Sequence, residues 1–522
     1  MTKRAFGALV LCAVLGALAL RTARLDVRPV HHDEANQAAK LGALLERGEY
    51  RYDPADHHGP TLYYLALPAA RAAGARDLAG LDETALRIAP ALAGTGVVVL
   101  FLLFAGGLTR EARVAAAALA AVSPAMTYYS RFYIQEILLV LFLTALVAAG
   151  WRYARSRSGW WAAAAGLSAG LMFATKETSL VLFGGLAAAL GLVFLTDRLG
   201  APRRGTVSAQ GGWSWRAAAT KFWTAPHVAL FLAFAAAAAA LFFTSFFRNP
   251  QGLADAVRAV GAAFERAGHP GVHAQPWSFY LQTLAYSRGA AGPVWSEAFL
   301  LFLAVAGGIS ACGRDSSPGE SPRFLRFVLF FTVVTAAAYS LIPYKTPWNL
   351  LPFGLGLVLL AGHGAALLLR AGRSRLARAL VLAALAPGFV HLAVQSYRAS
   401  FVDHSSPDNP YAYAPTSPDL LRLVAEVEGA AAASPEGRDM LVEVIAPPDE
   451  TWPLPWYFRR LGRVGYWTDP AAARRDVPAG WAGAVVASAA FADEVAEGLG
   501  EGYARTFYGL RPEVVLALFL PR

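Results

Sequence analysis

The chain has 522 residues, of which 56% are hydrophobic and 16% charged, and its formal net charge is +10. Together with a mean hydropathy of +0.41, this composition excludes disordered, fibrous and ordinary soluble proteins. A soluble chain of this length would need polar surfaces on several domains, but few long stretches are polar enough. The apolar excess must therefore face lipid.

The apolar stretches predict an α-helical polytopic membrane protein. A helix that crosses the hydrocarbon needs about 20 mostly apolar residues. The predicted spans are residues 5–20, 86–107, 112–125, 136–151, 159–174, 178–196, 226–246, 295–311, 325–342, 349–369 and 379–397, which makes about eleven transmembrane helices. The first also fits a signal peptide, since Lys3 and Arg4 precede it, but an uncleaved helix is expected in a polytopic chain.

The basic residues indicate orientation rather than nucleic-acid binding. Arg and Lys occur in short clusters between apolar stretches and form no continuous basic face. Placing the N-terminus in the cytoplasm makes every short loop on that side basic, as the positive-inside rule requires. The chain is therefore expected in the cytoplasmic membrane, with the C-terminal domain outside. Cys12 and Cys312 form no disulfide framework or metal motif.

Two domains are expected. Residues 1–397 form a transmembrane domain with long outer loops at 21–85 and 247–294. The composition changes over residues 398–522, where apolar runs short enough for strands, at 441–446, 484–488 and 514–520, alternate with helical stretches. This pattern predicts a small extracytoplasmic α/β domain. Long loops in a compact protein are usually functional, and the first loop contains two apolar patterns typical of interfacial helices.

The sequence His31-His32-Asp33-Glu34 follows the first span. In one interpretation Asp33 caps an interfacial helix and Glu34 lies in its first turn. In the other, a carboxylate at the membrane surface acts as a general base. Taken alone, the motif favours the cap.

Further ionisable residues are predicted on the same outer face. Such residues near hydrocarbon are costly unless they are paired, reach the interface or have a function. They are His58, Arg131, Glu136, Lys176 and Lys345. Independent anchors would be distributed over both faces, so this one-sided arrangement indicates a site.

The histidines of the outer loops have two interpretations. His57 lies beside His58, and His269 and His273 lie in the second long loop. They fit turns and membrane-packed loops, or His57 could hold a divalent metal with His269 or His273. Two histidines are a weak metal signal, so metal-free catalysis is preferred.

Several short motifs, in order over residues 1–400, resemble the GT-C superfamily of polyprenyl-phosphate-dependent glycosyltransferases, especially protein O-mannosyltransferases and aminoarabinose transferases. They are Asp33-Glu34, His58-Gly59-Pro60-Thr61-Leu62-Tyr63, Arg87, Glu136, Thr175-Lys176-Glu177 and Lys345-Thr346-Pro347-Trp348. Gly59 and Thr61 depart from the family pattern. The two histidine-rich motifs, His31-His32-Asp33-Glu34 and His57-His58-Gly59-Pro60, look most like those of a branch named for association with flippases in archaeal-type protein glycosylation.

The resemblance implies transfer of a sugar from a polyprenyl-phosphate donor to a protein, lipid or glycan acceptor at the outer membrane face. It implies that Asp33 is the base, supported by Glu34, and that Glu136 positions the base or a cation. His58, Arg131, Lys176, Lys345 and Arg87 are the expected substrate-binding residues. Membrane lipid is an expected partner and nucleic acid is not.

A flippase for lipid-linked sugars, or its non-catalytic partner, is the main alternative. Such a protein also needs a lipid groove and interfacial charges. Transporters tend to have internal repeats and polar residues near the middle of the bilayer, whereas the polar clusters here lie at one face. This difference favours the enzyme.

Overall fold

The computed structural model describes residues 1–54, 58–199, 224–268, 271–289, 292–313, 318–477 and 482–522. The chain divides into two compact units. Unit 1 comprises Met1–Ala23, Glu49–Leu65 and Arg87–Val402, and unit 2 comprises Arg24–Gly48, Ala66–Leu86 and Asp403–Arg522. Unit 2 thus contains much of the first outer loop as well as the C-terminal region.

All eleven segments predicted as spans are helical. Their bounds are α1 Lys3–Thr22, α4 Glu83–Leu100, α5 Arg110–Val122, α7 Glu136–Ser156, α8 Gly159–Phe173, α9 Ser179–Leu199, α11 Ala225–Phe243, α14 Ala298–Cys312, α15 Pro322–Leu341, α16 Leu351–Ala371 and α17 Arg375–Tyr397. Among the described residues, eight helices are long and apolar enough to cross a membrane. The remaining three, α5, α8 and α14, have 13, 15 and 15 residues, which is short of a full span.

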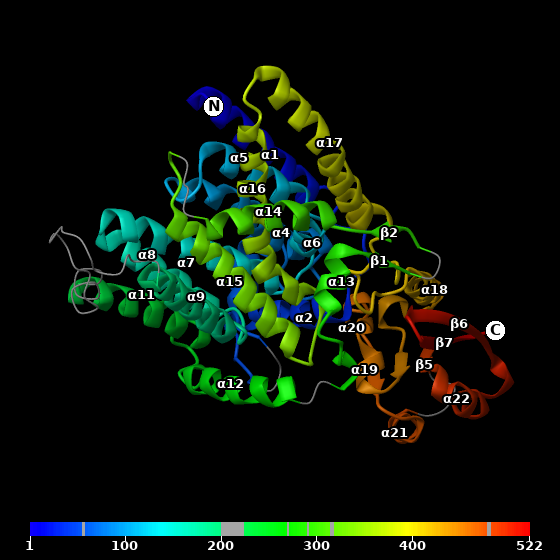
Figure 1. Cartoon of the computed structure of the whole chain (residues 1–522). Helices are drawn as coiled ribbons and strands as arrows, with labels where there is room; N and C mark the ends of the chain where they lie inside the picture. Colours follow the sequence, from blue (N-terminus) through cyan, green and yellow to red (C-terminus); the bar gives the residue numbers. More distant parts are fainter. Residues whose placement is uncertain (55–57, 200–223, 269–270, 290–291, 314–317, 478–481) are drawn as a thin grey trace, which may run out of the picture. The chain divides into compact units, whose positions relative to one another are not determined.

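The helices of unit 1 pack as a layered bundle. α8 lies between α7 and α11, α9 packs on α15, and α16 packs on both α5 and α14, as Figure 1 shows. A Cβ atom on Gly166 of α8 would lie 2.1 Å from the Phe231 carbonyl of α11. Only glycine permits this helix spacing, which is typical of packing in membranes.

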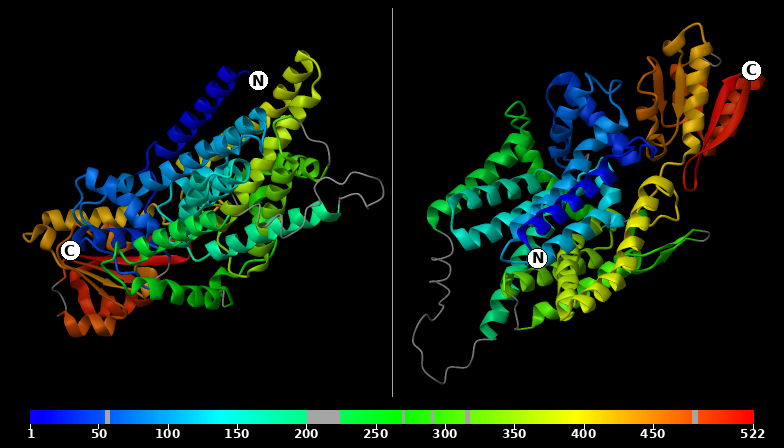
Figure 2. Two further views of the ribbon diagram at one scale, coloured as in Figure 1. Left: turned by 90° about the vertical axis from the view of Figure 1, so that its left-hand side faces the viewer. Right: turned by 90° about the horizontal axis from the view of Figure 1, so that it is seen from above.

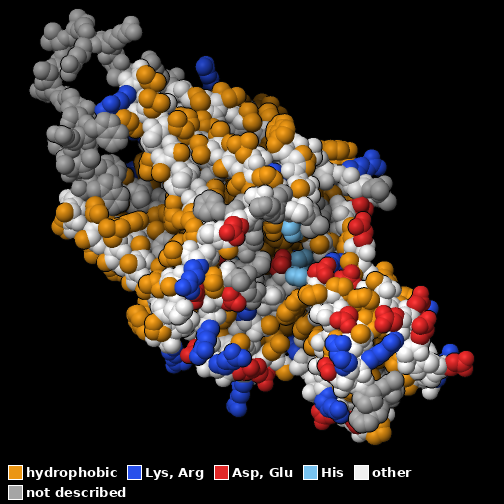
Figure 3. Space-filling model, turned by 90° about the horizontal axis from the view of Figure 1, so that it is seen from below, with side chains coloured by type: hydrophobic (Ala, Val, Ile, Leu, Met, Phe, Trp, Pro, Cys, Tyr) orange, Lys and Arg blue, Asp and Glu red, His pale blue; other side chains and the backbone are white. Residues whose placement is uncertain are grey.

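Shorter helices and one hairpin complete unit 1 and its connections. They are α3 Thr61–Ala72, α6 Pro124–Ser130, α12 Gly252–Gly268, α13 Phe279–Ala285, β1 Ser287–Arg288 and β2 Val294–Trp295. In the view of Figure 3, hydrophobic side chains cover broad areas, and charged side chains gather elsewhere. This distribution suits a chain embedded in lipid.

Unit 2 contains a five-stranded sheet with strand order β4-β3-β5-β7-β6. The strands are β3 Val442–Ile445, β4 Val464–Trp467, β5 Ala484–Ser488, β6 Tyr503–Arg511 and β7 Val514–Pro521. β3 pairs in parallel with β4 and β5, and β7 is antiparallel to β5 and β6. The β6–β7 hairpin is red in Figure 2. The predicted C-terminal strands are confirmed, whereas β4 and β6 were not predicted.

Helices cover both faces of this sheet. They are α18 Asp419–Ala433, α20 Leu454–Tyr457, α21 Pro470–Asp476 and α22 Ala492–Leu499. Unit 2 also contains α2 His32–Arg47, which packs against α20, and α19 Pro448–Thr451. Residues of α18 and α20 share one apolar cluster with the strands, and residues of α21 and α22 share another. The expected fold class, a polytopic helical membrane protein with a C-terminal α/β region, is confirmed.

Two arginines tie helix ends together inside unit 1. Arg21, near the end of α1, donates to the Ala120 and Ala121 carbonyls at 2.8 and 3.1 Å, and to the Ser130 hydroxyl at 3.1 Å. In return, Arg131 Nη1 donates to three backbone carbonyls at the end of α1, at 2.6 to 3.2 Å. Each guanidinium satisfies carbonyls that a helix end leaves unpaired.

Arg21→Leu should therefore destabilise the bundle by roughly 3 kcal/mol, because buried carbonyls lose their donors. The midpoint of thermal unfolding in detergent measures the loss. Arg4→Leu, at an exposed position on the same helix, is the control and should leave the midpoint unchanged. Equal midpoints for the Arg21 variant and the wild type would contradict the capping role.

Candidate active site

In unit 1, the segment 58–61 lies directly against the connection between α8 and α9. The Gly59 N–H donates to the Thr175 carbonyl at 3.0 Å, and the Thr61 and Thr175 hydroxyls are 2.8 Å apart. A Cβ atom on residue 59 would lie 2.0 Å from the Ala174 carbonyl oxygen. Gly59, a departure from the family pattern, is thus required by this close approach.

The imidazole of His58 pairs with the carboxylate of Glu177. Nδ1 of His58 lies 3.0 Å from Oε2 of Glu177, and the side chains are 22% and 8% exposed. Burial alone would raise the pKa of the Glu177 carboxyl, but the positive charge and hydrogen bond of His58, helped by Lys176, lower that pKa to about 2. Glu177 therefore stays ionised and orients the His58 ring.

Lys176 forms a buried ion pair with Glu136, the first residue of α7. The ammonium donates to Oε1 of Glu136, and the two side chains are 6% and 5% exposed. Glu136 Oε2, Glu177 Oε1 and Ser179 Oγ are buried and make no hydrogen bond within the described residues. Buried polar atoms without partners are uncommon, so this cluster is suited to a polar ligand.

Tyr339 of α15 borders the same cluster. Its hydroxyl hydrogen-bonds to the Thr178 side chain, and it lies within electrostatic reach of Glu136. The site thus combines the start of α7, the α8–α9 connection, α15 and the segment 58–61. We refer to His58, Glu136, Lys176 and Glu177 as the charged cluster of unit 1.

Three further predicted substrate-binding residues are buried in unit 1. Arg131 Nη1 donates to the end of α1, and its guanidinium lies 4.3 Å from the centre of the Phe401 ring. Lys345 Nζ donates to the Gln275 and Ile342 carbonyls at 3.0 and 2.6 Å, and burial lowers its pKa. Arg87 is 1% exposed. Their roles in substrate binding remain predictions.

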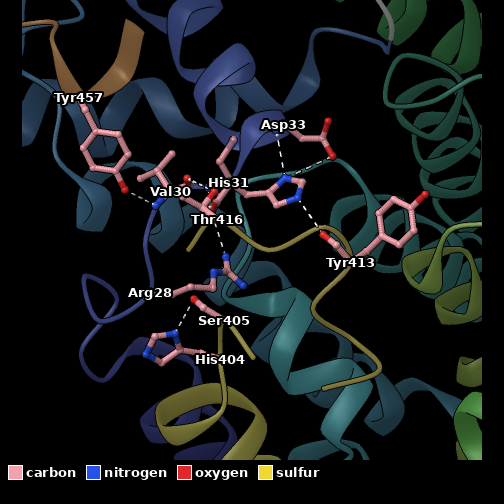
Figure 4. A network of polar contacts seen from close by, with 10 residues as sticks. Arg28, Val30, His31, Asp33, His404, Ser405, Tyr413, Thr416 and Tyr457 are labelled. Atoms are coloured by element: carbon pink, nitrogen blue, oxygen red, sulfur yellow. Dashed lines mark hydrogen bonds and ion pairs between the residues drawn. The ribbon is translucent and has the colours of Figure 1, made fainter. Parts of the chain in front are cut away.

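In unit 2, Asp33 lies in the first turn of α2 with its side chain 37% exposed. His31, rather than Asp33, is the N-cap: its Nδ1 accepts the Asp33 N–H at 3.1 Å, while Glu34 Oε2 accepts the His31 N–H at 3.1 Å. Figure 4 shows the contact between the His31 ring and Asp33. The interpretation of Asp33 as a cap is therefore wrong, and its carboxylate is left for another role.

Both carboxylate oxygens of Glu34 accept hydrogen bonds, one in the capping box and one from Arg28. Its side chain is 0% exposed, and Oε1 accepts a hydrogen bond from Arg28 at 3.1 Å. Both carboxylate oxygens are thus used inside unit 2. Glu34 supports Asp33 by fixing the start of α2 rather than by offering a second open carboxylate.

The predicted metal ligands are tested only in part. His57 and His269 lie outside the described residues, and the His273 ring packs on Tyr344 with centroids 4.5 Å apart. Within the described ranges, no group of three or more His, Cys, Asp or Glu side chains is arranged to hold a metal ion. The divalent metal remains a prediction.

Sequence comparison relates part of the chain to a known family. The profile of the family described as dolichyl-phosphate-mannose-protein mannosyltransferase matches residues 67–203. No curated protein matches the chain by sequence.

Solved structures match over almost the whole chain. ArnT from Cupriavidus metallidurans, solved bound to undecaprenyl phosphate, is 15% identical with a TM-score of 0.60, covering 98% of this chain and 97% of that one. The Archaeoglobus fulgidus oligosaccharyltransferase AglB, solved with an inhibitory peptide and a dolichol-phosphate, is 15% identical with a TM-score of 0.51, covering 96% and 72%. The chain therefore has the fold of the GT-C glycosyltransferases.

Sequence reasoning missed several residues that organise these sites. Glu177 stood beside Lys176 in the motif, and its adjacency to a predicted phosphate ligand was the available signal. His31 belongs to the predicted motif, but a histidine is an unusual N-cap residue. Nothing in the sequence indicates that Arg28 would bind Glu34.

Glu177→Gln should change how stability depends on pH. The folded-state pKa is lowered from 4.5 to about 2, so the stabilisation is complete above the unfolded-state pKa and is lost as pH falls toward the folded value. It amounts to roughly 3 kcal/mol. The unfolding midpoints of the wild type and the variant should differ most above about pH 5 and converge as the pH falls toward about 2.

Glu428→Gln, on an exposed position of α18, is the matched control and should follow the wild type at every pH. A gap between the wild type and the Glu177 variant that stays constant with pH would show that the carboxylate is not held ionised by His58.

Proposed function

We propose that this protein is an integral membrane glycosyltransferase that moves a sugar from a polyprenyl phosphate to an acceptor hydroxyl. The observation that carries the proposal is the charged cluster of unit 1, in which three motifs separated in sequence meet, within a chain that has the GT-C fold. The match to ArnT, solved with undecaprenyl phosphate, supports a polyprenyl-linked donor.

In the proposed reaction Asp33 is the general base. It takes the proton of the acceptor hydroxyl as the acceptor oxygen attacks the anomeric carbon of the sugar. The bond from that carbon to the phosphate oxygen breaks, and the polyprenyl phosphate leaves. Asp33 suits this role because its carboxylate is half-exposed while the helix cap is supplied by His31 and Glu34.

Lys176 and His58 are proposed to stabilise the departing phosphate. Glu136 and Glu177 each hold one of these groups in place, so the cations are preorganised before the phosphate charge develops. Preorganised charges of this kind lower a barrier without reorganisation during the reaction. Three buried cations are proposed to contribute to binding of the polyprenyl-phosphate donor: Lys345, Arg131 and Arg87.

The finer assignments are also part of the proposal. The cytoplasmic-side arginines favour an N-terminus inside and a reaction at the outer face of the cytoplasmic membrane. The histidine-rich motifs favour the branch named for association with flippases in archaeal-type glycosylation. A protein, lipid or glycan supplies the acceptor hydroxyl.

Asp33→Asn should lower kcat by about 10²–10⁴, because an amide cannot accept the acceptor proton. The assay incubates purified protein with a panel of undecaprenyl-phosphate-linked hexoses and pentoses and measures released undecaprenyl phosphate. Asp408→Asn, a partly buried position in the same unit, is the control. Full transfer by the Asp33 variant would overturn the base assignment, and no release by wild-type protein would favour the flippase.

Lys176→Met should lower kcat/KM for the donor by about 10²–10³, the usual loss when one preorganised donor is removed. The single variant also leaves Glu136 buried without its partner, which is destabilising. The double variant Lys176→Met/Glu136→Gln removes both charges and should regain the thermal midpoint. If activity returned with the midpoint, the ion pair would be structural and the phosphate role would be wrong.

A further inference from the structure

Val30, just before α2, is bound by side chains from the C-terminal part of unit 2. The Thr416 hydroxyl donates to the Val30 carbonyl at 2.9 Å, and the Val30 N–H donates to the Tyr457 hydroxyl at 2.8 Å. Figure 4 shows both bonds. Val30 is 0% exposed. Both backbone polar groups of this buried residue are therefore bound by the C-terminal region.

The His31 ring continues this connection. Nδ1 accepts the Asp33 N–H at 3.1 Å, and Nε2 lies 2.9 Å from the Tyr413 carbonyl. Because Nδ1 is an acceptor, Nε2 must carry the proton and donate to that carbonyl. One neutral tautomer thus satisfies both contacts and links Tyr413 to the backbone of Asp33.

The carboxylate of Asp33 stands at the end of this network. Its Oδ2 lies 3.6 Å from His31 Nδ1. Burial raises the pKa of the Tyr413 hydroxyl, and the negative charge of Asp33 raises it further. The Tyr413 side chain is therefore within electrostatic reach of the carboxylate, so the C-terminal region contributes to the surroundings of Asp33 as well as to its support.

We infer that Thr416, Tyr457 and His31 are positioning residues for Asp33. They fix where α2 begins and so where the Asp33 carboxylate stands, although none of them takes the proton. The inference rests on the proposed function, and it gives the C-terminal region a part in placing the proposed base. Small displacements of a reacting group cost much rate, about 10²-fold for 1 Å.

Thr416→Val with Tyr457→Phe removes both hydrogen bonds to Val30 and keeps the shapes of the side chains. Released undecaprenyl phosphate, measured with the sugar donor consumed fastest in the panel, should show a fall in kcat of about 10–100-fold with KM for the donor changed less than about twofold. In the Asp33→Asn background the same pair should cost less than about twofold, because positioning no longer matters once the base is gone.

A purely structural role predicts a different result. General destabilisation would lower activity by the same factor in both backgrounds, and this additivity would overturn the inference. Wild-type kcat in the Thr416→Val/Tyr457→Phe variant would also overturn the inference. In that case, a loss of activity in Asp33→Asn would still support Asp33 as the base. Tyr503→Phe removes a 2.6 Å hydrogen bond to the Ala482 carbonyl in the same unit and should leave kcat unchanged.

Amide hydrogen exchange tests the positioning without activity. Loss of the two bonds to Val30 should speed exchange in the peptide spanning residues 28–35 by about thirtyfold, since each hydrogen bond stabilises by about 1 kcal/mol and about 1.4 kcal/mol corresponds to a factor of ten. His31→Asn keeps an N-cap acceptor but is too short to reach the Tyr413 carbonyl, and should show a smaller acceleration than His31→Ala. Unchanged exchange in all these variants would overturn the inference even if no donor is consumed.

Discussion

The Lys176–Glu136 ion pair is the interaction on which the arrangement of unit 1 depends. Charged groups this deeply buried are tolerated only when they are paired and hydrogen-bonded. Because Lys176 and Glu177 are adjacent, the pair with Glu136 and the pair with His58 form one chain of charges. This chain joins the start of α7, the α8–α9 connection and the segment 58–61, so the architecture of the helices and the chemistry of the site are set by the same residues.

Charge has a second, purely architectural use in this unit. Arg21 and Arg131 each donate to the carbonyls at the end of a helix to which they do not belong. Ala120 and Ala121 are buried, so water cannot satisfy their carbonyls. The predicted phosphate contact Arg131 therefore has a structural use, and the cations of the charged cluster carry most of the proposed chemistry.

At the start of α2 in unit 2, the helix cap does not use the carboxylate of Asp33, the proposed base. His31 and Glu34 satisfy the free N–H groups, and Arg28 neutralises Glu34. Asp33 occupies the intervening position and is not used by the cap. A carboxylate in this setting keeps solvent access while its backbone is rigidly held, which is what a general base requires.

The sequence by itself determined the membrane class, the positions of all eleven apolar helices and three members of the charged cluster, His58, Glu136 and Lys176. Hydrophobic length and one-sided charge are local properties of the sequence, so they can be predicted from it. The predicted ranges 112–125, 159–174 and 295–311 are already shorter than a full span of about 20 residues, and the helices found there have 13, 15 and 15 residues.

Only the tertiary structure decided which charges meet. Nothing local pairs Glu136 with Lys176 or His58 with Glu177, because these contacts bridge 40 and 119 residues. Nor could the sequence show that Thr416 and Tyr457 would bind Val30. Such contacts depend on where folded elements bring their ends together, and side-chain type alone cannot specify that.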